Sequence, residues 1–149
     1  GGKVRIGRYD TSSGDWTFAY YPLDVRESPN NGWVGLSEIT ALGDGKFAIV
    51  ERDNQANTDA RIKRVYGIDV GEVTFKAQGM AFDTLGKTRL RDLMPDLLAT
   101  NGMVLEKIES LAVTANGDLL FANDNDGVDD SSGETQLIRV EKAFEKSLF

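Results

Sequence analysis

The chain contains no cysteine and no histidine. Without cysteine it forms no disulfide, has no thiolate nucleophile and offers no Cys-ligated zinc or iron–sulfur site. Without histidine it lacks the usual general base and the commonest metal ligand, so we expect no serine-triad, zinc-hydrolase or haem chemistry in this chain. The oxygens of Asp, Glu and Asn remain, and they suit hard cations such as calcium or magnesium.

Long apolar runs and concentrated positive charge are also missing. The longest strictly apolar runs have four residues, at 47–50 and 119–122, whereas a membrane-spanning helix needs about 20. Seventeen Lys and Arg face 24 Asp and Glu, which gives a net charge of −7. Binding to nucleic acid or to anionic lipid requires clustered cations. The sequence therefore predicts neither a nucleic-acid partner nor a membrane partner.

What the chain does contain is an internal repeat. Its 149 residues, 40% hydrophobic and 28% charged, fit one globular domain. Residues 36–54 align with residues 108–126 at an offset of 72 residues (108 − 36). Apolar residues recur with period two on both sides of the turn glycine in each copy, and the alignment matches Leu36 with Ile108, Ile39 with Leu111, Phe47 with Leu119 and Ile49 with Phe121.

Each copy has the pattern of a β-hairpin followed by a third strand. The turns are Asp44-Gly45 and Asn116-Gly117, and dipeptides of this kind are the strongest short hairpin signal. A third alternating run follows each hairpin, at 61–70 and at 136–140. Residues 3–9 and 16–23 predict one more hairpin before the first copy.

A different periodicity separates the two copies. Within residues 84–101, apolar side chains follow helical spacing at Leu90, Leu93, Met94, Leu97 and Leu98. This spacing predicts a short amphipathic helix near residues 88–99. Pro95 falls inside the run and marks either a break or the first helical turn.

A long-period repeat of hairpin plus further strand indicates an all-β chain built from β-propeller blades. The sequence provides about two and a half blades, whereas propellers have about 4–8. Unpaired strand edges invite pairing with another segment. We therefore expect a partial propeller whose remaining blades come from a missing N-terminal half or from self-association through the open edges.

Two polar motifs follow the hairpins, Glu51-Arg52-Asp53 after the first and Asn123-Asp124-Asn125-Asp126 after the second. Together with the hairpins at 35–50 and 107–122, they resemble the phytase-like β-propeller family known for "esterase-like activity of phytase". The resemblance runs from about residue 4 to residue 140 and is to the C-terminal half of that domain, so we assign residues 1–149 to one domain. It implies a secreted or periplasmic bacterial protein, often regarded as a hydrolase.

The segment 123–134 is the richest concentration of oxygen donors in the chain. Calcium takes six to eight oxygen ligands, so Asp124 and Asp126 are candidate ligands. The same residues also suit a solvated turn, because Asp, Asn and Gly satisfy the backbone in turns. Glu38 and Glu109 lie near the starts of their first strands, where they would face a central channel; alternatively, one of each neighbouring pair faces water.

Arg52 lies between two acids, and this position supports two interpretations. It forms a salt bridge that ties neighbouring blades, or it holds a phosphate or carboxylate at the propeller mouth. As an enzyme, the chain would be a metal-assisted hydrolase of phosphate or carboxylic esters. Calcium would then bind Glu109, Asp124 and Asp126, with Glu38 as base and Arg52 as anion clamp. The rival hypothesis is a non-catalytic propeller that binds a ligand or protein and holds structural calcium.

Overall fold

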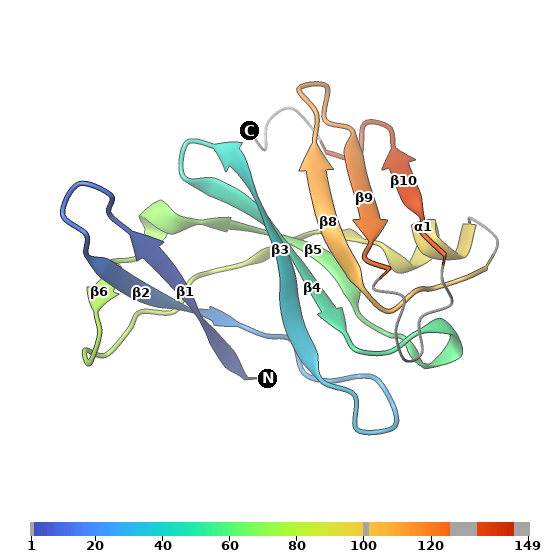
Figure 1. The fold of residues 1–149 in the computed structure, drawn as a ribbon, viewed down its shortest axis with the longest axis horizontal. Helices are drawn as coiled ribbons and strands as arrows, with labels where there is room; N and C mark the ends of the chain where they lie inside the picture. The colour runs from blue at the N-terminus through green and yellow to red at the C-terminus, as the bar shows by residue number, and fades with distance from the viewer. Residues whose placement is uncertain (1, 100–101, 126–133, 145–149) are drawn as a thin grey trace.

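The structure, a computed structural model, describes residues 2–99, 102–125 and 134–144. Within these residues, ten strands form three antiparallel sheets, accompanied by one short α-helix. Figure 1 shows the three sheets one after another across the molecule, in the order of the chain. No helix in the described part is long and apolar enough to cross a membrane. The expected all-β class is confirmed.

The middle sheet has four strands in the order β3 (Val34–Gly43), β4 (Lys46–Asp53), β5 (Lys63–Asp69) and β7 (Thr88–Asp92). Its first two strands are the hairpin that the sequence predicts. At the turn Asp44 has φ 47° and Gly45 has φ 77°. Two successive positive φ angles match the twist of a two-residue hairpin, which is why a small polar residue followed by glycine occupies this turn.

The third sheet repeats this pattern with β8 (Ile108–Val113), β9 (Leu119–Asn123) and β10 (Leu137–Val140). Its hairpin also confirms the sequence prediction. A β-bulge interrupts the pairing between Leu36 and Glu38 in the middle sheet and between Ile108 and Ser110 in the third sheet. The two bulges are 72 residues apart, so the repeat extends to a local irregularity of the backbone.

The first sheet contains β1 (Lys3–Tyr9), β2 (Trp16–Pro22) and the two-residue strand β6 (Lys76–Ala77). The predicted N-terminal hairpin is therefore confirmed. Strand β6 belongs to the segment between β5 and β7, which begins with the 3₁₀ helix η2 (Val70–Glu72). This segment leaves the middle sheet, pairs with the edge of β2 and returns. The Tyr20 backbone bonds it twice, accepting from Leu85 N at 2.8 Å and donating to Asp83 O at 2.8 Å.

The predicted helix near residues 88–99 is only half correct. Helix α1 covers Met94–Ala99, with Pro95 in its first turn, whereas residues 88–92 form strand β7. The open edge of β5 accepts this strand, with Gly67 opposite Thr88 and Arg64 opposite Asp92. Pairing with an existing strand thus overrides the helical spacing of the side chains. The second 3₁₀ helix, η1 (Asn57–Asp59), lies in the loop between β4 and β5.

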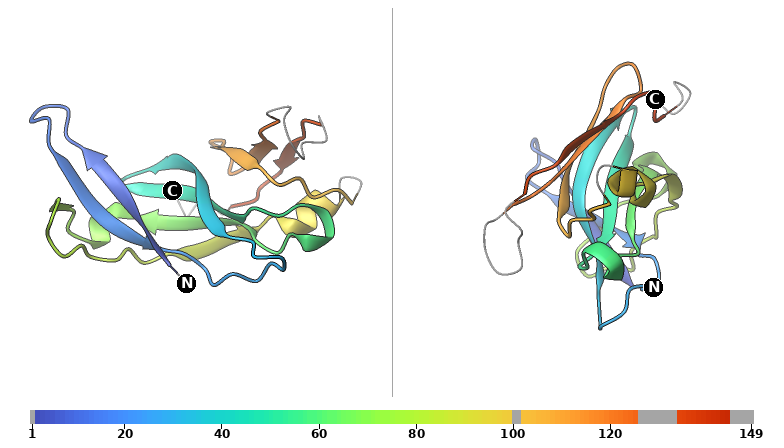
Figure 2. Two further views of the ribbon diagram at one scale, coloured as in Figure 1. Left: turned by 60° about the horizontal axis from the view of Figure 1, so that its bottom comes forward. Right: turned by 90° about the vertical axis from the view of Figure 1, so that its right-hand side faces the viewer.

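The middle sheet is covered on both faces. On one face, Ile49 and Tyr66 pack with Ala19 and Tyr21 of the first sheet. On the other face, Ala48 and Val50 belong to a cluster that includes α1 and the third sheet, with buried Leu97, Ile108, Leu119 and Phe121. Figure 2 shows this succession from two further sides. Alternate residues of β4 therefore face different neighbours.

Neighbouring sheets meet most closely at β3 and β8, the first strand of each repeat. Ser37 Oγ donates a hydrogen bond to Ile108 O at 2.6 Å, and Thr40 Oγ1 donates to Leu111 O at 2.8 Å. The middle and third sheets are thus joined along their first strands. Three open sheets in this arrangement fit blades of a partial propeller.

Candidate functional site

The Glu51-Arg52-Asp53 motif ends β4, and its three side chains make contacts in three different parts of the fold. All three residues are buried. Glu51 accepts hydrogen bonds from Tyr21 Oη at 2.7 Å, from Asp24 N at 2.6 Å and from Lys87 Nζ at 2.7 Å. Tyr21 belongs to the first sheet, Asp24 follows β2, and Lys87 directly precedes β7. Glu51 therefore joins the middle sheet to the first sheet.

Arg52 contacts the opposite neighbour. Its Nη2 lies 2.5 Å from Glu109 Oε1, and its Nη1 lies 3.4 Å from Glu106 Oε1. The guanidinium also lies over the ring of Trp33, 5.6 Å from the ring centroid. Both charged contacts reach β8 or the segment before it, so Arg52 joins the middle sheet to the third sheet. This is the geometry of a brace between two sheets, with the guanidinium fork directed at two carboxylates of the chain itself.

Asp53 closes the loop that follows its own strand. Its carboxylate accepts from Lys63 Nζ at 2.8 Å, from Arg61 N at 2.7 Å, from Ile62 N at 3.0 Å and from the hydroxyl of Ser28. Asp53 and Lys63 are both fully buried. Burial alone would raise the pKa of Asp53, but the hydrogen bonds from Lys63 and Ser28 outweigh it and lower the pKa.

Lys87 sits in a cage of aromatic rings and carboxylates between the first and middle sheets. Its Nζ lies 2.7 Å from Asp24 Oδ1 and 2.7 Å from Glu51 Oε2. It also lies 4.0 Å from the ring centroid of Tyr66 and 5.0 Å from that of Tyr21. Two carboxylates and two π-faces thus hold one ammonium group, which fixes the returning end of the segment between β5 and β7.

Asp24 links this cage to a second cation. It accepts from Arg64 Nη1 at 2.6 Å and from Tyr66 Oη at 2.5 Å. Burial acts to raise the pKa of Asp24, but hydrogen bonds from Lys87, Tyr66 and Arg64 bring it down to about 2. Burial raises the pKa of Tyr21 well above its ordinary value, and the negative charge of Glu51 raises it further. Asp24 is therefore ionised, and Tyr21 protonated, throughout the neutral range.

Glu38 lies in a different environment, at the bulge of β3. Its Oε1 accepts a hydrogen bond from Ile39 N at 2.7 Å. It lines a hollow of about 410 Å³ between the first and middle sheets, together with Ile6, Gly7, Leu36, Ser37, Ile39 and Ile49. Apart from Ser37 and Glu38, the named side chains are apolar or absent. Glu38 is thus a carboxylate on the rim of an apolar hollow.

The three predicted metal ligands are placed as follows. Glu109, half-buried at the bulge of β8, pairs with Arg52. Asp124 is exposed just after β9, and its backbone N donates to Lys107 O at 2.8 Å. Asp126 lies outside the described residues. The described part of the chain contains no group of three or more Asp or Glu arranged to hold a metal ion.

The structure brings some of these candidates together. Ser37 and Ile108, the neighbours of Glu38 and Glu109, share a hydrogen bond, so the two acids lie on adjoining strands. Arg52 joins this region through Glu109. Sequence reasoning missed Trp33, Tyr21, Asp24, Tyr66 and Lys87. They come from separate strands and loops with no common spacing, so no sequence pattern marks them as a cluster.

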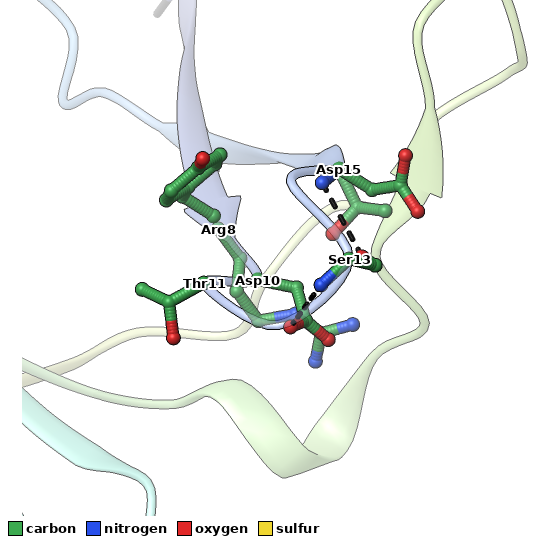
Figure 3. A pocket seen from close by; sticks show the side chains of 7 residues that line it. Arg8, Asp10, Thr11, Ser13 and Asp15 are labelled. Atoms are coloured by element: carbon green, nitrogen blue, oxygen red, sulfur yellow. Dashed lines mark hydrogen bonds between the residues drawn. The ribbon is translucent and has the colours of Figure 1, made fainter.

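A further hollow, of about 630 Å³, lies at the tip of the β1–β2 hairpin and includes Arg8, Asp10, Ser13 and Asp15 in its lining (Figure 3). One of its acids, Asp10, serves the turn itself. Asp10 Oδ1 accepts from Ser12 N at 2.8 Å and from Ser13 N at 3.2 Å. These two backbone hydrogen bonds lower the pKa of Asp10. The Asp10 carboxylate thus stabilises the turn, as Asp does in many turns.

Comparison with known proteins identifies the family of this chain. No curated protein and no solved structure matches the chain. One family model matches residues 1–127, and its description is "Esterase-like activity of phytase". This match covers most of the chain, including both hairpins and the Glu51-Arg52-Asp53 motif. The chain therefore belongs to the phytase-like family.

Proposed function

We propose that the chain is part of an ester-hydrolysing β-propeller, and that it acts on carboxylic esters with an apolar group. The hollow lined by Glu38 carries this proposal. It combines one carboxylate with walls formed by Ile6, Leu36, Ile39 and Ile49. Its volume, about 410 Å³, falls in the range of small-molecule sites.

The lining favours a carboxylic ester over a phosphate ester. None of the described residues that line the hollow carries a positive charge. A phosphate group beside the Glu38 carboxylate would meet repulsion with no compensating cation. Arg52, the predicted anion clamp, is paired with Glu109 and Glu106. A neutral carboxylic ester is not repelled by Glu38 and needs no cation to bind.

In this proposal Glu38 acts as a general base. Its carboxylate takes a proton from a water molecule, whose oxygen attacks the carbonyl carbon of the ester. The bond from this carbon to the alcohol oxygen then breaks, and the leaving oxygen takes the proton back from Glu38. The products are a carboxylic acid and an alcohol. A positioned carboxylate can do this work without histidine.

We propose these steps for Glu38 and a water molecule, with no calcium ion. That Asp124 and Asp126 bind calcium stays a prediction from the sequence. We place such an ion in the segment 123–134 as a stabilising ion.

We also propose a secreted or periplasmic location and a propeller completed by further blades, from other polypeptide or from a second copy. Sedimentation of the chain as a stable monomer would contradict completion by a second copy.

The second candidate function is a non-catalytic binding module. The contacts of Glu51-Arg52-Asp53 favour it, because all three side chains are engaged in holding the sheets and the following loop together. In that case the mouth of the propeller binds a ligand or a protein and catalyses no reaction.

One assay separates these functions. The chain is tested on p-nitrophenyl butyrate and p-nitrophenyl phosphate, with and without EDTA. We expect butyrate hydrolysis that EDTA leaves unchanged and that Glu38→Gln reduces by about 10²-fold or more. The control Glu72→Gln, at an exposed carboxylate in η2, should keep full activity. Activity on the phosphate alone, or equal activity in Glu38→Gln, contradicts the carboxylic-ester proposal. No activity on either substrate favours the binding module.

A further inference from the structure

The first sheet has one face that is turned away from the middle sheet, and this face combines aromatic rings with cations. In the β1–β2 register Arg5 lies opposite Tyr20, so the side chains of Arg5 and Tyr20 share a face. Lys3, two residues from Arg5, lies on the same face. Ala19, next to Tyr20 on β2, faces the other way and is buried against the middle sheet. Strands β1 and β2 are drawn in blue in Figure 1.

The segment between β5 and β7 adds a wall to this face. Phe82 packs edge-to-face on Tyr20, with 5.3 Å between the ring centroids, and lies 5.7 Å from Phe18. Met80, 60% exposed, follows a turn in which Gly79 has φ 91°. Together with β1 this segment encloses a hollow of about 530 Å³, whose lining includes Lys3, Arg5, Tyr20, Gln78, Met80 and Phe82.

The hollow has a charge opposite to that of the chain as a whole. Two cations line it, and none of the described residues in its lining is acidic, although the chain carries a net charge of −7. Both cations donate hydrogen bonds to neutral groups. Lys3 Nζ donates to Thr84 Oγ1 at 2.9 Å, and Arg5 Nη1 donates to Gln78 Oε1 at 3.3 Å. Neither acceptor neutralises the positive charge, so an anion placed here gains from both side chains.

We propose that this hollow binds a small anionic arene, an aromatic ring that bears a carboxylate. The ring packs against Tyr20, Phe82 and Met80, which supply aromatic and thioether surface. The carboxylate accepts hydrogen bonds from the Arg5 guanidinium and the Lys3 ammonium. This site is separate from the hollow of Glu38. Ile6 lines that hollow, and its side chain packs against the core on the opposite face of β1.

Binding needs both halves of the ligand. Lys3 and Arg5 are exposed, so water and salt screen the attraction to an isolated anion. A neutral ring gains only the apolar contact. We therefore expect benzoate to bind at least tenfold more tightly than acetate, which has the charge alone, and than benzyl alcohol, which has the ring without the charge. Benzoate binding should weaken severalfold when NaCl is raised from 20 mM to 500 mM.

The experiment titrates the 149-residue chain with these three probes and follows the methionine methyl groups by NMR. Met80 lines the hollow, whereas Met94 begins helix α1 and packs on the other core cluster, so it serves as an internal reference. Benzoate should shift the Met80 methyl signal and leave that of Met94 unchanged. Arg5→Gln and Phe82→Leu should each weaken benzoate binding at least fivefold. Arg89→Gln, at an exposed cation on β7, should leave it unchanged.

Three results would overturn the proposal. Equal affinity for acetate and benzoate would show a general attraction of anions. Unchanged benzoate binding in Arg5→Gln, which removes the positive charge of an exposed side chain, would contradict Arg5 as the partner of the carboxylate. A Met80 signal that shifts with protein concentration and no longer responds to benzoate would show that another polypeptide surface covers this face.

Discussion

The middle and third sheets begin as copies of one repeat, but the residue that ends the second strand differs in its chemistry. In each sheet this residue binds residues between the second and third strands. In the middle sheet, buried Asp53 accepts hydrogen bonds from Lys63, Ser28 and two backbone N–H groups. In the third sheet, the Asn123 amide accepts from Gln136 N at 2.6 Å and donates to Glu134 O at 3.0 Å. One loop depends on a buried ion pair, the other on a neutral amide.

The positions of the two sheets explain the difference. The middle sheet has a neighbour on each face, and its motif joins both, through Glu51 to the first sheet and through Arg52 to the third. In the described part of the chain, the third sheet packs against the middle sheet on one face only. Charged braces appear where a strand must fix two neighbours, and removing one partner of such a brace leaves a buried charge unpaired.

The largest predicted effect comes from breaking the ion pair of the middle sheet. Lys63→Met leaves the Asp53 carboxylate buried without its cation, and we expect the free energy of unfolding to fall by about 3–5 kcal/mol. Urea denaturation measures this loss. The control Arg89→Met, at an exposed cation of the same sheet, should change stability by less than about 0.5 kcal/mol. A loss below about 1 kcal/mol for Lys63→Met would mean that the two sheets do not differ as proposed.

The next effect concerns the brace toward the first sheet. Asp24→Asn weakens the hydrogen bonds from Lys87, Arg64 and Tyr66, and we expect a loss of about 2–3 kcal/mol at pH 7. The pKa of Asp24 is lowered to about 2, from about 3.9 in the unfolded chain. Its stabilisation is therefore complete above about pH 4 and is lost as the pH falls toward 2.

Denaturation curves at several pH values test this sign. The stability difference between the native chain and Asp24→Asn should shrink steadily between pH 4 and pH 2. A difference that stays constant over that range would show that the Asp24 carboxylate is not held in its ionised form by the cage.

A smaller loss is expected in the third sheet. Asn123→Ala removes a neutral amide and leaves Gln136 N without its partner, which should cost about 1–2 kcal/mol. Asn123→Asp is the sharper variant, because it puts a carboxylate where the middle sheet has one but provides no matching lysine. We expect Asn123→Asp to be at least as destabilised as Asn123→Ala at pH 7. Full stability in Asn123→Asp would contradict the view that the middle sheet needs Lys63.

The smallest effect is that of calcium. If Asp124 and Asp126 help to bind it, the ion supplies to the third sheet the positive charge that Lys63 supplies to the middle one. At ten times the dissociation constant, calcium would stabilise the fold by about 1.4 kcal/mol. The melting temperature should rise with calcium, less with magnesium, and not at all in Asp124→Asn/Asp126→Asn. No rise in the native chain at 10 mM calcium would leave the segment as a solvated turn.

The two hairpin units follow from local patterns, and these were readable in the sequence. Alternating apolar residues and the Asp44-Gly45 turn specify a strand, a turn and a second strand without help from distant residues. Strand β7 shows the limit of such patterns. Leu90 fits both a helix and a strand, and only the open edge of β5 decides in favour of the strand.

The candidate site was readable in part. The Glu51-Arg52-Asp53 motif stands out because it ends an apolar strand, and Glu38 stands out because it lies near the start of one. Which of them pair with each other depends on sheets that lie far apart in the sequence. Arg52 meets Glu109 across 57 residues and Glu51 meets Lys87 across 36.

The sequence by itself determined the all-β class, the repeat of 72 residues, the hairpins and the family. The first three depend on alternating residues and turn dipeptides between near neighbours, and the family was recognised from its motifs. Only the tertiary structure decided that Lys87 enters a cage of Tyr21 and Tyr66, that Arg52 binds Glu109, and that Glu38 borders an apolar hollow. Such contacts arise when separate sheets pack face to face, because the partners of a buried charge are set by packing and not by spacing along the chain.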